Sequence, residues 1–194
     1  MPFKRISPEK NVSELTPLDI SCTSTKCDDE LHCFKLNKKL KEKYGKDGVC
    51  RDCGIDLVDW SRIKRTDLQD VNYTFTMLKK ELIRHVYWHT GIKKSAVQEA
   101  YKMGKILLRE QAEKTIRQKI ARNLGIFDGR QTPKEGNIIN YAQHATATCC
   151  RKCIEYWYKI PADSNYTEEQ INFFIELIML YIKDRVKGIT DVGQ

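Results

Sequence analysis

The chain has 194 residues, eight of them cysteines, and carries 34 lysine and arginine residues against 26 aspartate and glutamate residues, for a formal net charge of +8. This length allows a sizeable buried core. The longest apolar run, residues 171–182, is interrupted by Asn172 and Glu176 and is shorter than the ~20 residues that a membrane span needs. We therefore expect no membrane segment, and the beginning MPFKRISPEK, which lacks an apolar stretch, predicts no secretory signal.

Residues 1–60 are predicted to form an N-terminal arm and a cysteine-rich zinc module. Three prolines in the first 20 residues favour an extended arm. Phe34, Leu36 and Leu40 have the spacing of a short helix that Gly45 ends, and VCRDCGIDLVDW predicts a tight turn followed by a strand. We expect a cytoplasmic protein, in which thiols stay reduced, so metal binding or catalysis is the favoured use of the cysteines.

Residues 61–194 are predicted to form a helical domain. Apolar residues at helical spacing predict one helix over residues 73–89 and another from Ser95 to about residue 123, with a basic outward face. A polar stretch over residues 124–148 predicts a loop with a short strand at residues 137–141. Thr167 and Gln170 form a capping-box pattern at the start of the last helix, which we expect to be the central packing helix.

The predicted fold class is therefore α+β, mostly helical, with small zinc-stabilised ribbon or treble-clef-like elements. The cysteines fall into an early and a late group, because none occurs between Gly54 and Thr148. The zinc prediction is based on these two groups. The candidate metal ligands are Cys22, Cys27, Cys50, Cys53, His144, Cys149, Cys150 and Cys153.

In the early group, Cys50 and Cys53 form a C-x2-C-G knuckle, whose two-residue spacer lets both thiolates reach one tetrahedral ion. Cys22 and Cys27 offer a second pair of ligands, and His32 and Cys33 lie nearby in the sequence. A structural zinc is the favoured interpretation, and free buried thiols or redox chemistry are the alternatives.

In the late group, HATATCCRKCIEYW places Cys150 and Cys153 in the first turn of a helix, where free backbone N–H groups favour thiolates. His144 and Cys149 would supply the remaining ligands, although a buried thiol cluster is the alternative. Spacing alone also allows the early and late cysteine pairs to share one ion.

A histidine pair raises a third metal possibility. His85 and His89 are spaced i, i+4 and share one helix face, which suits a common ion. Because His89 falls on the apolar face beside Trp88, buried core histidines are an equal alternative.

The charge pattern favours a nucleic-acid partner, with a solvated charged surface as the alternative. Trp60 stands beside a run of cations, and further cations flank the late cysteines. The candidate nucleic-acid-binding residues are Arg62, Lys64, Arg65, Lys105, Arg109, Arg117, Arg130, Lys134 and Arg151. A protein-interaction factor with structural zinc only is a further class.

The polar stretch before the late cysteines allows an enzyme interpretation, a metal-dependent hydrolase or nuclease in which a bound water is activated. Its alternative is that these groups satisfy backbone ends and support metal ligands. The signatures of zinc nucleobase deaminases and of H-E-x-x-H metalloproteases are absent. The residues concerned are Asp128, Arg130, Gln131, Thr132, Gln143, His144, Thr146 and Thr148.

The segments DGRQTP and AQHATATCCRKCIEYWYKIP resemble a bacterial and phage domain family of unknown function with an AQHATATCC-x-x-C signature. The resemblance covers roughly residues 101–182 and implies a compact zinc–cysteine domain with no assigned reaction. The early cysteine module is then an extension of that domain. The family motif has a histidine and a glycine where this chain has Tyr158 and Lys159.

Overall fold

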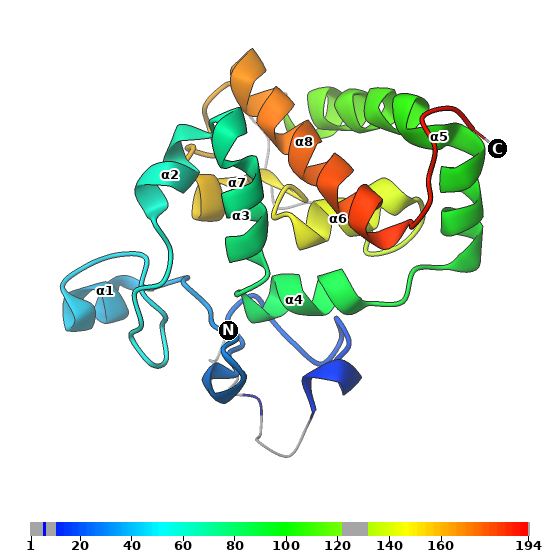
Figure 1. Cartoon of the computed structure of the whole chain (residues 1–194). Coiled ribbons are helices and arrows are strands. Elements are labelled where there is room, and N and C mark those ends of the chain that lie inside the picture. Colours follow the sequence, from blue (N-terminus) through cyan, green and yellow to red (C-terminus); the bar gives the residue numbers. More distant parts are fainter. Residues whose placement is uncertain (1–5, 7–10, 122–131, 194) are drawn as a thin grey trace.

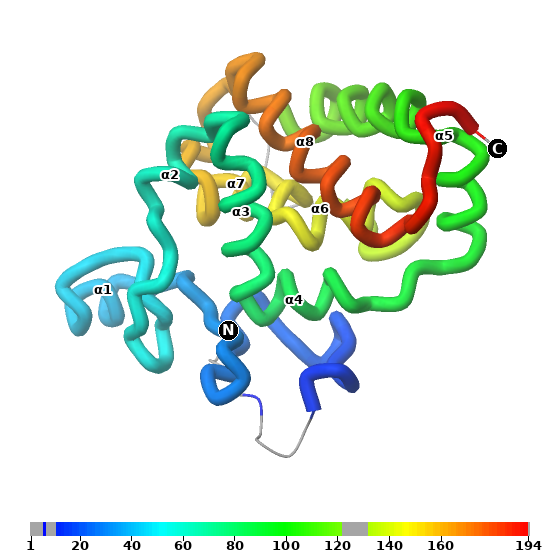
Figure 2. Tube along the Cα trace, in the orientation of Figure 1, coloured from blue at the N-terminus to red at the C-terminus, as the bar shows by residue number. Residues whose placement is uncertain are grey.

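A computed structural model describes residues 6, 11–121 and 132–193, which form helices joined by irregular segments (Figures 1 and 2). In chain order the helices described are η1 (Val12–Glu14), η2 (Cys27–Asp29), α1 (Lys38–Tyr44), α2 (Trp60–Arg65), η3 (Leu68–Asp70), α3 (Val71–Leu78), α4 (Leu82–His89), α5 (Lys94–Thr115), η4 (Ile116–Ile120), α6 (Ile138–Ala145), α7 (Arg151–Tyr158) and α8 (Glu168–Arg185).

The predicted mostly helical character is confirmed, but the β part of the α+β class is not. Among the described residues, the β-bridges between Lys26 and Leu31 and between His32 and Glu81 are isolated, and these residues form neither a ribbon nor a sheet. The strand expected after Gly54 is irregular backbone in the structure. None of the described helices combines the length and the apolar character needed to cross a membrane.

Helix α8 is the central packing helix, as its sequence predicts. It begins with a capping box in which Thr167 and Gln170 satisfy each other's backbone N–H groups. Phe173, Phe174 and Leu177 are completely buried, and the helix contacts α3, α5 and α6. Figure 1 shows α8 in front of α6, with α3 on its left and α5 on its right. Burial of each such side chain stabilises the fold by roughly 1.5–3 kcal/mol.

Helix α6 replaces the strand predicted at residues 137–141. The Asn137 side chain accepts a hydrogen bond from the Asn140 backbone N–H at 3.1 Å, which caps the helix start. Ile138, Ile139 and Tyr141 are all buried, because α6 packs between α4 and α8. A short apolar run does not distinguish a strand from a helix buried on several sides, so the strand prediction was wrong here.

The helix predicted over residues 73–89 is broken at residues 79–81. Glu81 is extended, with φ −91° and ψ 124°. The His32 backbone pairs there instead, donating to the Lys80 carbonyl at 2.8 Å and accepting from the Leu82 N–H at 2.9 Å. These bonds from the early module replace helical bonds, so α3 and α4 are separate helices.

Helix α5 bends at Gly104, where φ is 71° and ψ is 172° (Figures 1 and 2). The helix restarts with Lys105 and Ile106 donating to the carbonyls of Thr190 and Asp191, at 2.9 and 3.0 Å. A Cβ on Gly104 would lie 2.4 Å from the Val192 carbonyl carbon, so glycine is needed both for its positive φ and for this close approach.

The early module and the helical domain share one core. Phe34 and Val58 belong to the same buried cluster as the helices, and the Phe34 ring contacts Trp60 and Trp157 edge-on, with centroids 5.7 and 6.1 Å apart. The short helix α1 ends at Gly45 as expected, although it begins at Lys38. The division into residues 1–60 and 61–194 stays a prediction.

Candidate metal centres

Four donor atoms meet in the early module, from Cys27, His32, Cys50 and Cys53, and we call them the first cluster. All four lie within 4.8 Å of one another. Cys27 Sγ is 3.7 Å from Cys50 Sγ, and Cys53 Sγ is 3.6 Å from His32 Nδ1. For tetrahedral zinc with ordinary bond lengths, adjacent donors would be about 3.8 Å apart for two sulfurs and about 3.6 Å apart for sulfur and nitrogen. The donor set therefore fits a tetrahedral ion.

Local backbone geometry positions these donors. The mutual backbone bonds of Lys26 and Leu31, at 2.8 and 3.1 Å, turn the chain between Cys27 and His32. In the C-x2-C-G knuckle, the Gly54 N–H donates to the Cys50 carbonyl at 2.9 Å. Gly54 has φ 77°, a conformation that glycine adopts without strain.

The first cluster favours a thiolate at Cys50. Burial raises the pKa of Cys50, but hydrogen bonds from His32 and from the backbone of Cys33, Cys53 and Asp52 lower it to about 6. The pKa of Cys27 is raised by burial and by the negative charge of Cys50. One thiolate is thus present near neutral pH. A bound cation would offset the charge repulsion that opposes formation of a second thiolate at Cys27.

Cys149, Cys150 and Cys153 form the second cluster, with their sulfurs within 4.8 Å of one another. Cys150 is the N-cap of α7, and the Cys153 N–H donates to its carbonyl at 3.0 Å, as expected for cysteines in a first helical turn. All three are buried. Hydrogen bonds from the Cys149 and Cys150 thiols, together with the charge of Arg84, lower the pKa of Cys153.

A buried ion pair supports the second cluster. Arg84 donates from Nη2 to Cys153 Sγ at 3.4 Å, from Nη1 to the His144 carbonyl at 2.6 Å and from Nε to Glu81 at 3.2 Å. The Glu81 carboxylate also accepts bonds of 2.6 Å from Tyr156 Oη and Trp157 Nε1. Sequence reasoning missed Glu81 and Arg84, and the only signal was their position among apolar residues of a predicted helix.

His144 lies beside the second cluster but outside its group of donors. Its Nε2 is 2.8 Å from the Thr132 carbonyl, and its ring stacks on Tyr87 with centroids 4.6 Å apart. Burial lowers the pKa of His144, so the ring is neutral and donates this bond. The structure does not bring His144 to the three sulfurs.

Cys22 lies outside the first cluster, where His32 stands in the place expected for it. Burial raises the pKa of Cys22, and the charges that affect it include Arg84 and Cys153. Cys22 therefore lies near the second cluster. The early and late cysteine pairs fall into separate groups, so the geometry does not favour the arrangement in which they share one ion.

Polar side chains before the second cluster bond to one another. Thr132 Oγ1 donates to Gln143 Oε1 at 3.0 Å, and Gln143 Nε2 donates to the Thr148 carbonyl at 3.1 Å. Thr146 Oγ1 donates to the Ala142 carbonyl at 2.8 Å. These bonds favour the alternative that the groups satisfy backbone and side-chain needs. Asp128, Arg130 and Gln131 lie outside the described residues.

The rings of His85 and His89 are 4.1 Å apart between centroids. His89 is exposed rather than on the apolar face as expected. Burial and the neighbouring His89 lower the pKa of His85 to about 4. In the part of the chain that the structure describes, this pair does not belong to a group of three or more possible metal donors.

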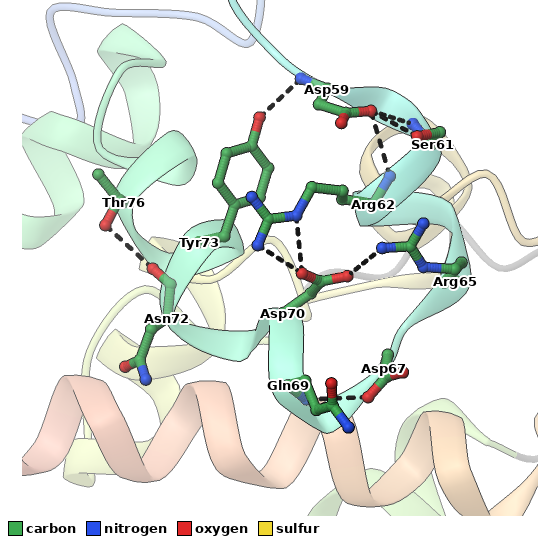
Figure 3. Close-up of polar contacts among 10 residues, drawn as sticks. All are labelled: Asp59, Ser61, Arg62, Arg65, Asp67, Gln69, Asp70, Asn72, Tyr73 and Thr76. Carbon is green, nitrogen blue, oxygen red and sulfur yellow. Dashed lines mark hydrogen bonds and ion pairs between the residues drawn. The ribbon is translucent and has the colours of Figure 1, made fainter.

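Most candidate nucleic-acid-binding arginines form ion pairs within the chain. Arg62 and Arg65 both bind the buried Asp70 carboxylate, at 2.6 and 2.7 Å, and Arg62 lies 4.0 Å from the Tyr73 ring centroid (Figure 3). These bonds join α2 to the start of α3. The guanidinium groups of Arg62 and Arg65 therefore hold α2 against the start of α3.

The remaining cations differ in exposure. Lys105 binds Asp191 at 2.7 Å, Arg109 binds Glu176, and Arg117 binds Glu113 and Glu168 at 2.7 and 2.6 Å. Arg151 is buried, and its guanidinium donates to the carbonyls of Ile120, Ala162 and Ser164. Lys64 and Lys134 are exposed, whereas Arg130 lies outside the described residues.

These features define a mostly helical chain with two groups of cysteine and histidine side chains that could hold metal ions. A family model described as a domain of unknown function, DUF4186, matches residues 72–183, more than half of the chain. The chain belongs to this family. The match contains the second cluster with Glu81 and Arg84, but none of the donors of the first cluster. No solved structure matches the chain.

Proposed function

We propose that the protein binds zinc and that the first cluster is a structural zinc site. The observation that supports this most is the pair of donor separations, 3.7 Å between Cys27 and Cys50 and 3.6 Å between Cys53 and His32, which are those of a tetrahedral site. Thiolate and imidazole donors suit zinc. Four protein ligands leave no position for a reacting molecule, which is typical of a structural site.

The second cluster is proposed to hold a second zinc ion, with Cys22 as its fourth ligand. Three thiolates around Zn²⁺ carry one net negative charge and four carry two, and the buried Arg84 guanidinium offsets part of this charge. Cys22 does not belong to the group of three sulfurs that lie within 4.8 Å of one another, but the charges of Arg84 and Cys153 affect its pKa, which supports its choice as the fourth ligand. Burial of the cluster favours a structural role over catalysis.

Zinc analysis of four variants tests both sites. We expect two zinc ions per chain in protein prepared without chelator, and one fewer in each of Cys53→Ser, Cys153→Ser and Cys22→Ser. Cys53→Ser and Cys153→Ser should also lower the melting temperature, because metal binding free energy is coupled to folding. Cys33→Ser is the matched control, since Cys33 is buried but belongs to neither cluster.

Each outcome bears on a separate part of the proposal. Absence of stoichiometric zinc would refute it as a whole. A Cys22→Ser variant that keeps two ions would remove Cys22 from the second site and leave three thiolates there.

Nucleic-acid binding through a basic surface is a second candidate, favoured by the net charge of +8 and by exposed Lys64 and Lys134, which form no ion pair with another described residue. If they contact phosphates, Lys64→Glu and Lys134→Glu should weaken binding of all sequences alike and flatten the salt dependence. A mobility-shift titration with single- and double-stranded DNA and RNA measures this. Absence of binding tighter than roughly 10⁻⁴ M at physiological salt would favour a protein-interaction factor instead.

A further inference from the structure

A cleft of about 450 Å³ lies between the early module and helix α7. Its walls come from residues 34–47 on one side and residues 152–161 on the other. The first wall lies outside the region that matches the family and the second lies within it. The volume is in the range of small-molecule sites, which are roughly 300–1,000 Å³.

Lysines dominate the charge of this cleft. Lys35, Lys41, Lys152 and Lys159 line it, together with the carboxylates of Asp47 and Glu155, which leaves two surplus positive charges. Asp47 already binds Lys41 at 2.8 Å. Lys35 and Lys159 form no ion pair with another described residue, so they are the lysines that a bound anion would meet.

The backbone conformation of Lys159 and its contacts with two aromatic rings place its side chain at the cleft. Lys159 ends α7 in the left-handed conformation, with φ 59° and ψ 24°, which is strained for a residue with a Cβ. Its ammonium lies 4.6 Å from the Trp60 ring centroid and 5.7 Å from that of Tyr156. The Trp60 ring is fixed in turn by its bond to the Gly48 carbonyl, at 2.8 Å.

The surroundings of Lys159 leave its charge without a carboxylate. Among the described residues no acidic group forms an ion pair with it, since the nearby Asp47 is paired with Lys41. Burial lowers the pKa of Lys159. Lys159 is thus a partly desolvated cation that lies over aromatic rings in a strained backbone conformation. Such features occur at ligand sites, because a bound anion compensates for the lost solvation of the cation.

We propose that this cleft binds a di- or triphosphate group, with Lys159 and Lys35 as its principal phosphate contacts. Two surplus charges match two phosphates better than one, and the cleft is larger than a single phosphate requires. An inorganic polyphosphate and a nucleoside di- or triphosphate both offer this group, whereas a nucleic-acid backbone offers only single phosphodiesters. The site is independent of the zinc ions and of the exposed lysines Lys64 and Lys134.

Calorimetric titration of the full chain tests the proposal. The probes are inorganic tripolyphosphate, ATP, adenosine and a single-stranded 12-nucleotide DNA. We expect tripolyphosphate and ATP to bind and adenosine not to bind. Lys159→Gly and Lys35→Ala should each weaken binding by about 10- to 100-fold, the effect of losing a hydrogen bond to a charged group. Lys64→Ala is the matched control and should bind like the wild type.

Lys159→Gly should not destabilise the fold, because glycine adopts the left-handed conformation without strain. Its melting temperature should be at least as high as that of Lys64→Ala. If only the DNA binds, and Lys159→Gly abolishes its binding, the cleft takes single phosphodiesters of a nucleic-acid backbone and the di- or triphosphate proposal is overturned. The proposal is overturned if no phosphate probe binds with a Kd below about 1 mM. It is also overturned if Lys159→Gly binds every probe like the wild type.

Discussion

Replacing Glu81 by glutamine should destabilise the protein strongly, although the two side chains have nearly the same shape. The carboxylate is buried and accepts hydrogen bonds from Arg84, Tyr156 and Trp157. An amide keeps only one acceptor oxygen and carries no charge. The Arg84 guanidinium, which is 2% exposed, would lose the carboxylate that balances it.

The magnitude follows from the burial of the pair. Breaking a buried ion pair by removing one partner costs about 3–5 kcal/mol, and for a chain of this size each kcal/mol lowers the melting temperature by about 2–4 °C. We therefore expect Glu81→Gln to melt about 6–20 °C below the wild type. The Cys153 sulfur, 3.4 Å from Arg84 Nη2, moderates this loss where it is ionised.

Thermal unfolding followed by far-ultraviolet circular dichroism measures the effect in protein prepared without chelator. Glu99→Gln is the matched control, because Glu99 is exposed on α5, and it should change stability by less than about 0.5 kcal/mol. The double variant Glu81→Gln, Arg84→Met should recover part of the loss, since it removes the unbalanced charge. Equal melting temperatures for Glu81→Gln and Glu99→Gln would refute the reasoning.

Two further predictions follow from backbone geometry and from a histidine. Gly104→Ala should lower the free energy of unfolding by at least about 1–2 kcal/mol, the cost of a Cβ in a left-handed conformation, and that Cβ would also meet the Val192 carbonyl carbon at 2.4 Å. A denaturant titration measures this, and Gly91→Ala, whose Cβ would enter open space, should be nearly neutral in it. The pKa of His85 in the folded protein is lowered from 6.5 to about 4, so between these pH values the unfolded chain binds more protons than the folded one. The wild type should therefore lose stability relative to His85→Gln as the pH falls through that range. A constant difference between the two proteins from pH 7 to pH 4 would contradict this assignment.

Several parts of the fold could be predicted because a local rule decides them. The capping box at Thr167 and the glycine that ends α1 depend only on neighbouring residues. The C-x2-C-G knuckle likewise has both donors within one turn. Cys50 and Cys53 fall in one group and Cys150 and Cys153 in another for the same reason, since only two residues separate the members of each pair.

Other parts depend on contacts between distant segments, which periodicity does not contain. The break at residues 79–81 exists because the His32 backbone takes the hydrogen bonds there. Residues 137–141 are helical because they are buried between α4 and α8. His32 replaces Cys22 in the first cluster for a related reason, because the turn between Lys26 and Leu31 brings Cys27 and His32 together beside Cys50 and Cys53.

The two clusters are physically joined at Glu81. The backbone on either side of Glu81 bonds to His32, a donor of the first cluster. Its carboxylate binds Arg84, whose guanidinium reaches Cys153 in the second cluster. The Phe34 N–H donates to Tyr156 Oη at 3.0 Å, and this hydroxyl donates to Glu81. Glu81 belongs to the region that matches the family, whereas His32 and Phe34 precede it. The early module is thus attached by hydrogen bonds to the region that matches the family at Glu81, whose carboxylate balances the charge of Arg84 beside the second cluster.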